Sequence, residues 1–383
     1  MKTINLSLLL FISVCVSAQD LPYKIGNKIL VVSGGGARGA WGVGVVDTLV
    51  KSRGGYKAVL GVSTGSTMGP LVLLQQFDLL TEIYTSTTQK DIFNKNPFKV
   101  KIQGDTVKTT PRLGMALRRL ACGKATIGET KNFKKLIDKF FTKKHFDELR
   151  SRGLLLGVGV TNMTSGNFEL KTSANNDYER MKNWIWASAN QPLWMSYVHM
   201  DGSDYVDGGL RQVVPFEDAV RYAIDYDIDS IDVIINNSYD PILKGWEAKK
   251  DSWLAGLVRV LGVYGLGTHQ YSLRVGKLLA DINSCQDASQ NTQSGNVQGN
   301  DGRNIHVIFY FMPDELAATY RDELGFDKNR MKALLLEGKK YFKPTNDLPS
   351  TNARMESSTK PAKKGMMEFN VTPKMMREKF LDK

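Results

Sequence analysis

The chain has 383 residues, a length that fits one large α/β unit or two smaller domains, and its 42% hydrophobic content is ample for a buried core. Only three cysteines occur, which excludes a small disulfide-stapled scaffold. The net charge of +12 favours acidic partners over basic ones.

The first 18 residues have the pattern of an export signal. Lys2 gives a positive start, residues 6–16 form a short apolar run, and Val16-Ser17-Ala18 has the small residues that precede signal-peptidase cleavage. The run is too short to span a bilayer comfortably. We therefore expect residues 1–18 to be removed and the mature protein to be periplasmic or secreted.

The mature chain opens with the elements of an α/β fold. A buried strand over residues 28–33 runs into a glycine-rich turn and a helix over 40–51. A second strand over 58–62 leads directly into a helix over 64–80. This alternation predicts a three-layer α/β/α fold whose central sheet is largely parallel.

A strongly basic segment follows. Between Lys95 and Arg152 there are 16 Lys and Arg residues and 5 Asp and Glu residues, a balance of +11. Helices are expected here over 113–120 and 130–141. Such a segment attracts anionic lipid surfaces or nucleic acid, and it equally fits a solvated basic surface.

The remaining periodic segments continue the fold. Strands are expected over 154–161, 167–171, 204–206, 231–235 and 305–311, and helices over 178–189, 216–223 and 328–341. We expect one domain over 24–343, a flexible polar loop over 286–304, and a polar basic tail over 344–383 that is disordered.

Gly61-Val62-Ser63-Thr64-Gly65 fits a nucleophile elbow, the sharp strand-to-helix turn that exposes a serine hydroxyl. Side chains two positions before and after the serine would collide, so both positions need glycine. The turn also aims the free N–H groups of the following helix at the reaction centre. Five-residue matches recur by chance, so an ordinary glycine-rich turn remains the alternative for this pattern alone.

Residues 34–39 (GGGARG) match the dinucleotide pattern G-x-G-x-x-G between a strand and a helix. That fingerprint needs an acidic residue at the end of the second strand, whereas this strand ends in Leu60-Gly61-Val62-Ser63. Consecutive glycines also form a backbone cradle whose N–H groups can hold an oxyanion or a phosphate. A nucleotide-binding enzyme is therefore the alternative interpretation of this loop.

Asp207-Gly208-Gly209 places a carboxylate at a strand end where another backbone can approach closely, although Asp-Gly turns are common. His269 or His306 would complete the chain order of a Ser–Asp–His triad. Neither histidine lies in a recognisable loop signature.

Taken together, the glycine loop, the serine elbow and the Asp-Gly-Gly motif resemble the patatin-like phospholipase family, in that family's order. The resemblance covers about Lys28 to Pro215. It implies a dyad in which Ser63 attacks an ester carbonyl and Asp207 takes its proton, with no histidine, metal or organic cofactor. It implies oxyanion donors at Gly34, Gly35, Gly36 and Thr64. It implies supporting roles for Arg38, Gly39, Gly61, Gly65, Gly208 and Gly209.

The resemblance also implies a substrate class. A patatin-like enzyme would cleave acyl esters of lipids or phospholipids. From the basic segment Lys95 to Arg152 we expect an anionic membrane surface as partner, and not nucleic acid. A non-catalytic lipid-binding protein on the same scaffold is the further alternative. Two positions depart from the family pattern, which has an acidic residue at Ser33 and often an asparagine at Val213. Arg38 would either neutralise a lipid phosphate or pair with a carboxylate that fixes the loop.

Two features remain open. The apolar, glycine-containing segment Trp246 to Asn283 is either an ordinary core helix or part of an acyl-chain cleft. Cys122 and Cys285, the two cysteines left after the leader, either pair or stay separate thiols.

Overall fold

The computed structural model describes residues 20–103, 106–239, 305–341 and 366–371, together with single helical positions between 256 and 270. Its main sheet contains β1 (Lys28–Val32), β2 (Ala58–Val62), β5 (Leu155–Asn162), β6 (Phe168–Thr172), β7 (Val198–Met200), β8 (Ser203–Asp207), β9 (Ser230–Ile235), β10 (Ile305–Phe311) and β11 (Met366–Val371). A separate hairpin is formed by β3 (Phe98–Gln103) and β4 (Thr106–Pro111).

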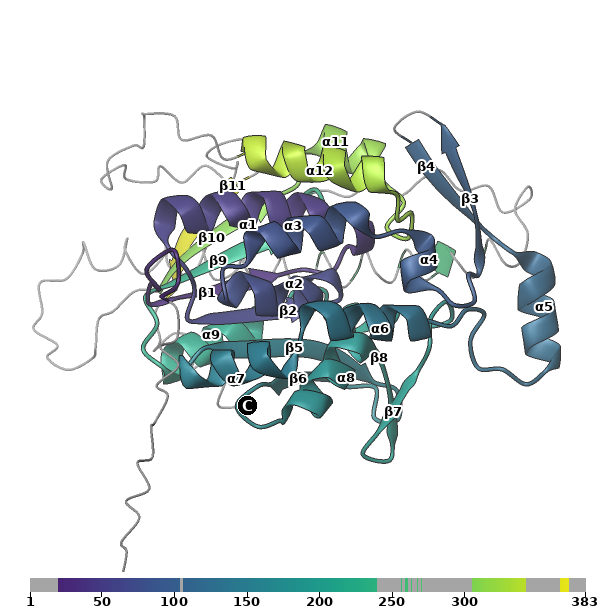
Figure 1. Cartoon of the computed structure of the whole chain (residues 1–383), viewed down its shortest axis with the longest axis horizontal. Coiled ribbons are helices and arrows are strands. Elements are labelled where there is room, and N and C mark those ends of the chain that lie inside the picture. Colours follow the sequence, from purple (N-terminus) through teal and green to yellow (C-terminus); the bar gives the residue numbers. More distant parts are fainter. Residues whose placement is uncertain are drawn as a thin grey trace, which may run out of the picture.

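The helices of the described residues surround this sheet (Figure 1). They are α1 (Gly39–Arg53), α2 (Thr64–Leu73), α3 (Phe77–Ser86), α4 (Gln89–Ile92), α5 (Leu113–Ala121), α6 (Lys131–Phe140), α7 (Lys143–Ser151), α8 (Tyr178–Ser188), α9 (Phe216–Asp225), α11 (Asp314–Thr319) and α12 (Lys328–Tyr341). Short 3-10 turns occur at η1 (Gly36–Arg38) and η2 (Gly208–Leu210).

The sheet has the order β11-β10-β9-β1-β2-β5-β8-β7, with β6 also paired to β5. Its centre, from β10 through β9, β1 and β2 to β5, is parallel, and the strands beyond are antiparallel. The expectation of an α/β/α fold with a largely parallel sheet is therefore confirmed. The carboxyl ends of β1 and β2 lie side by side, because Val32 pairs with Gly61.

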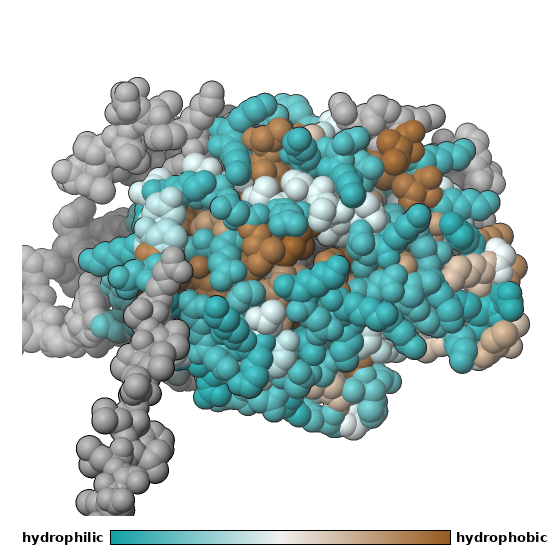
Figure 2. Space-filling model, in the orientation of Figure 1, coloured by the Kyte–Doolittle hydropathy of each residue, from teal (hydrophilic) through white to brown (hydrophobic). Residues whose placement is uncertain are grey.

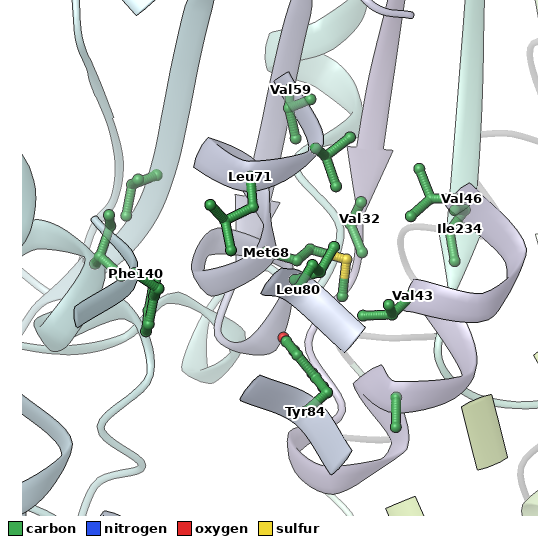
Figure 3. Packing of buried hydrophobic residues seen from close by; sticks show 14 of the residues in the cluster. Val32, Val43, Val46, Val59, Met68, Leu71, Leu80, Tyr84, Phe140 and Ile234 are labelled. Carbon is green, nitrogen blue, oxygen red and sulfur yellow. The ribbon is translucent and has the colours of Figure 1, made fainter. Parts of the chain in front are cut away.

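Two apolar clusters cover the two faces of the sheet. Leu30 and Val32 of β1 belong to the cluster beneath α1, α2, α3 and α12, whereas Ile29 and Val31 belong to the cluster that contains α9. Alternate residues of a strand point to opposite faces, so a strand buried on both faces is apolar throughout. Figure 3 shows part of the first cluster, where side chains of α1, α2 and α3 meet those of β1 and β9.

Helix α12 packs closely along α1 (Figure 1). A Cβ atom on Gly44 of α1 would lie 2.2 Å from the Leu335 carbonyl oxygen, and one on Gly338 of α12 would lie 2.1 Å from the Trp41 carbonyl oxygen. Glycine at both positions therefore lets the two backbones touch. This contact carries the C-terminal helix to the same side of the sheet as the glycine-rich loop.

Three sequence predictions need correction. The helix expected over 64–80 is two helices, because the chain breaks after α2 and Gln75 adopts a φ of 55°. The β3–β4 hairpin within the basic segment was not expected. The tail is not wholly disordered, since residues 366–371 form β11, antiparallel to β10. A strand there satisfies backbone groups that the edge of β10 would otherwise expose.

Several predictions fall outside the described residues. They are the leader 1–18, the polar loop 286–304, nearly all of the segment Trp246 to Asn283, and Cys285. Cys122 is described, and its exposed thiol has no disulfide partner among the residues that the structure describes.

Candidate active site

Ser63 stands at the sharp turn between β2 and α2. Its φ of 55° and ψ of −121° lie in a region that L-residues rarely adopt, so the neighbouring structure must hold the residue there. The Ser63 N–H donates to the Ser188 hydroxyl at 2.9 Å, and that hydroxyl donates to the Gly159 carbonyl at 2.6 Å. The Ser66 N–H and hydroxyl both donate to the Ser63 carbonyl. The elbow is therefore fixed from both sides.

The two flanking glycines leave no room for side chains. A Cβ atom on Gly61 would lie 2.3 Å from the backbone carbon of Gly65, and one on Gly65 would lie 2.3 Å from the Val32 carbonyl oxygen. These distances are far below any normal contact. The start of α2 therefore packs directly against the ends of β1 and β2, which is what the elbow pattern predicts.

Asp207 ends β8 and is brought to Ser63 by the pairing of β8 with β5. Its N–H donates to the Asn190 carbonyl at 2.9 Å, and its carbonyl accepts from the Thr161 hydroxyl at 3.0 Å. Its carboxylate accepts from the Gly209 N–H at 2.8 Å. A Cβ atom on Gly208 would lie 2.5 Å from the Gly159 carbonyl oxygen, so this turn also requires glycine.

The Asp207 carboxyl is enclosed, and burial raises its pKa to about 7. Hydrogen bonds from the Ser63 side chain and the Gly209 N–H oppose that rise, and the negative charge of Glu323 adds to it. A carboxyl that titrates near neutrality beside a serine hydroxyl has the properties of a general base.

The glycine loop lies beside the elbow, and its amides differ in their partners. The Gly34 N–H donates to the Val213 carbonyl at 3.2 Å. We therefore correct the expectation that Gly34 is an oxyanion donor, because its N–H is already engaged. Among the described residues, the N–H groups of Gly35, Gly36 and Thr64 have no acceptor. These three amides remain available to a ligand oxygen.

The loop needs glycine because other segments press against it. Gly35 and Gly36 have φ values of 150° and 54°. A Cβ atom on Gly35 would lie 2.7 Å from the Asn236 side chain, and one on Gly36 would lie 2.2 Å from the Glu323 carbonyl oxygen. A Cβ atom on Gly39 would overlap the Thr64 hydroxyl. The loop therefore sits between α2 and the segments after β9 and α11.

Arg38 is buried and pairs with protein groups. Its guanidinium donates to the Asn237 side chain at 3.0 Å and forms an ion pair with Glu323. The Glu323 carbonyl also accepts from the Ala37 N–H at 2.8 Å. Of the two roles expected for Arg38, the structure has the one that fixes the loop.

An apolar pocket with Ser63 in its wall lies between the helices. Its volume, including the part that is open to solvent, is about 700 Å³. Gly36, Ser63 and Thr64 lie in its wall, and apolar side chains of α2, α3, α6 and α12 and of the segment before α12 form most of the remainder. Figure 3 labels four of these residues: Leu71, Leu80, Tyr84 and Phe140. The pocket has the character of an acyl-chain site.

A profile of the patatin-like phospholipase family matches residues 30–220, which contain the elbow, the glycine loop and Asp207. The chain belongs to the patatin-like phospholipase family. Its members act on lipids as acyl hydrolases, and the activity expected from the resemblance is confirmed at this level. No similar protein was found among curated proteins.

Among solved structures, this patatin-like chain is similar to VipD from Legionella pneumophila. The identity is 12%, the match covers 81% of this chain and 67% of the other, and the TM-score is 0.32. The family assignment rests on the profile and not on this distant likeness.

The patatin-like site contains residues that the sequence did not reveal. Ser188 holds the Ser63 amide, Asn236 holds the loop, and Glu323 anchors both the loop backbone and Arg38. They lie far from the motifs in sequence, so local patterns gave no signal for Asn236 and Glu323. Ser33, where the family has an acidic residue, accepts from the Asn236 N–H at 2.9 Å and so serves to join β1 to β9.

The histidines do not complete a triad in the described part of this patatin-like enzyme. His306 pairs with Ser230 at the amino ends of β10 and β9, whereas Ser63 follows the carboxyl end of β2. The length of a strand, roughly 15 Å, separates these two edges. His199 is exposed and bonds Asp204 at 3.1 Å. His269 lies outside the described residues.

The described residues contain no group of three or more His, Cys, Asp or Glu side chains able to hold a metal ion. No helix among them is both long enough and apolar enough to cross a bilayer.

Proposed function

We propose that this protein is an exported lipid acyl hydrolase in which Ser63 is the nucleophile and Asp207 is its base. One observation carries the proposal: a strained serine in the wall of an apolar pocket is hydrogen-bonded to a buried carboxyl with a pKa of about 7. Serine needs a positioned proton acceptor to attack an ester. The Asp207 carboxyl is hydrogen-bonded to the Ser63 side chain, whereas His306 lies at the opposite edge of the sheet.

The steps follow from the positions of these groups. The Ser63 oxygen bonds to the ester carbonyl carbon while its proton passes to the Asp207 carboxylate. The carbonyl oxygen becomes an oxyanion within reach of the Gly35, Gly36 and Thr64 N–H groups. When the C–O bond breaks, Asp207 gives the proton to the leaving alcohol. Water then hydrolyses the acyl-serine, with Asp207 again taking and returning a proton.

The substrate is proposed to be an acyl ester in an anionic lipid surface. The apolar pocket accepts the acyl chain, and the basic segment Lys95 to Arg152 faces the lipid charge. Export is proposed from the leader pattern of residues 1–18.

A fluorophosphonate probe tests the chemistry directly. It should label wild-type protein at Ser63 and leave Ser63→Ala unlabelled. Ser63→Ala should lose at least about 10³-fold in hydrolysis of a short-chain nitrophenyl ester while keeping its circular dichroism spectrum. Asp207→Asn should lose nearly as much. Full turnover by either folded variant would remove that residue from the proposed dyad.

A further inference from the structure

Helix α5 is the part of the described chain whose exposure the catalytic site leaves unexplained. No residue of this helix is buried, and Figure 1 shows α5 standing apart from the layers, beyond the β3–β4 hairpin. Leu113, Leu117 and Leu120 are 49%, 51% and 69% exposed. Their spacing of four and three residues places them on one face of the helix.

The surroundings of this apolar face are cationic. From Phe98 to Lys124 the sequence has seven cations and one carboxylate, Asp105. The cations are Lys99, Lys101, Lys108, Arg112, Arg118, Arg119 and Lys124. Figure 2 shows hydrophobic residues in brown and tan at the end of the molecule that carries the hairpin and α5, among hydrophilic ones. A leucine face flanked by cations is the composition of an interfacial helix that lies in an anionic lipid surface.

The helix is held in a fixed orientation. Arg119 donates to the Thr126 carbonyl at 2.6 Å and pairs with Glu129 at 2.8 Å. Lys95 also pairs with Glu129, at 2.9 Å. Burial would raise the pKa of Glu129, but hydrogen bonds from Lys95, Arg119 and Asn94 prevail and lower it to about 2, so this carboxylate stays charged. Arg119 is therefore engaged with the protein, and the leucines remain free to face outward.

The same segment adjoins the apolar pocket. The Ile127 N–H donates to the Leu193 carbonyl at 2.8 Å, and Gln191 and Met195 on either side of Leu193 line the pocket. On the other flank, the Thr109 N–H of β4 donates to Asp322 at 2.5 Å, and the pocket residue Leu324 lies two positions after Asp322. The hairpin and α5 are thus bonded to two walls of the site.

We propose that α5 inserts its leucine face into an anionic lipid surface and thereby positions the apolar pocket next to the bilayer. This inference rests on the proposed function for its substrate, but it concerns binding alone. Insertion buries apolar side chains and therefore makes the surroundings of α5 less polar, which attraction by charge alone does not do. If α5 inserts, the strength of vesicle binding depends on the leucines as well as on the salt concentration.

Vesicle binding with matched variants tests the proposal. The vesicles contain equal parts of phosphatidylcholine and phosphatidylglycerol, and all proteins carry Ser63→Ala so that the lipid stays intact. Replacing both Leu117 and Leu120 by glutamate should weaken binding by about tenfold or more. Leu336→Glu is the control, because Leu336 is 46% exposed on α12. It should bind as the parent does.

Cys122 offers a direct probe, because it follows α5 and its thiol is free. With Cys15 and Cys285 changed to serine, a polarity-sensitive dye on Cys122 should brighten and shift to the blue on adding vesicles. The same dye on Leu336→Cys, in a chain that also carries Cys122→Ser, should not change.

Three results would overturn the inference: unchanged binding by the double variant, equal loss in the Leu336→Glu control, or an unresponsive dye on vesicle-bound protein. The proposed function is judged separately, because hydrolysis of a soluble ester by the same variants with Ser63 restored does not require a vesicle. That hydrolysis should be unaffected by the α5 substitutions.

Discussion

At the scale of single residues, the proposed role of Asp207 predicts that catalysis depends on pH. Its carboxyl has a pKa of about 7 against an ordinary value of 3.8, because the side chain is buried and Glu323 is near. Only the ionised form can accept the Ser63 proton. We therefore expect kcat/KM for a soluble ester to rise with pH through about 7 and then to level. An activity that is flat from pH 5 to 9 would contradict Asp207 as the base.

The same pKa predicts a stability difference. Between pH 4 and 7, Asp207 is ionised in the unfolded chain but keeps its proton in the folded protein. The free energy of unfolding therefore falls by about 1.4 kcal/mol for each unit by which the pH rises across this window. Asp207→Asn removes that contribution. Its melting temperature should rise relative to wild type as pH increases across this window, with no further gain above it. Parallel melting curves at all pH values would show that the carboxyl is not enclosed.

Ser63 has a backbone conformation that costs free energy. With a φ of 55°, any residue with a Cβ atom is strained, whereas glycine is not. Ser63→Gly and Ser63→Ala both remove the hydroxyl and should both be inactive. The glycine variant should be more stable than the alanine variant, by about 1 kcal/mol in urea unfolding. Equal stability would mean that the elbow is relaxed when no substrate is bound.

The sequence was informative at this scale where a residue's chemistry needs its immediate neighbours. Ser63 is recognisable because Gly61 and Gly65 must leave room around it. Asp207 is recognisable because of the two glycines after it. Glu323 is not, because its contacts with Arg38 and the loop depend on how distant segments meet, and no local pattern encodes that meeting.

At the scale of elements, we expect helices α2, α3 and α6, which line the pocket, to limit the length of acyl chain that it can take. Ile83 of α3 is half-buried and lines the pocket, whereas Leu79, one turn earlier, is half-buried but does not line it. Ile83→Trp should lower kcat/KM for long-chain esters relative to short-chain ones, because the added ring occupies space needed by the chain. Leu79→Trp is the matched control and should leave that ratio unchanged.

Unequal results for these two variants would place the acyl chain against the pocket-facing side of α3. The apolar character of Trp246 to Asn283 left it open as either an ordinary core helix or part of an acyl-chain cleft, and nearly all of it lies outside the described residues. The actual walls include α3 and α6, whose apolar residues resemble those of any packed helix. Periodicity indicates which face of a helix is buried, but it does not distinguish a filled core from an apolar hollow.

At the scale of the whole molecule, the C-terminal strand closes one edge of the sheet. β11 pairs with β10 along its whole length, at the far side of the sheet from β8 and Asp207. Removing residues 366–383 should expose the backbone groups of β10 and promote self-association, which size-exclusion chromatography would detect. Soluble-ester hydrolysis by the monomer should persist. A truncated protein that stays monomeric at high concentration would show that the edge needs no cover.

The order of strands was predictable only in outline. Apolar strands alternating with helices indicate a parallel sheet, and the centre of the sheet is one. The pairing of β11 was not predicted. Met367, Phe369 and Val371 alternate with polar residues, as in a strand, but this local pattern does not show that β10 is the partner. Long-range pairing of this kind depends on the assembled sheet.

The contacts of the glycine loop have a consequence for protein synthesis. Gly35 and Gly36 leave the ribosome early, but Asn236 and Glu323, which press on them, are made some two hundred and three hundred residues later. A nascent chain that already contains Ser63 and Asp207 therefore still lacks the residues that press on Gly35 and Gly36. A lipid-cleaving enzyme made inside a cell would thus stay harmless to its maker's own membranes until almost the entire polypeptide had been translated and folded.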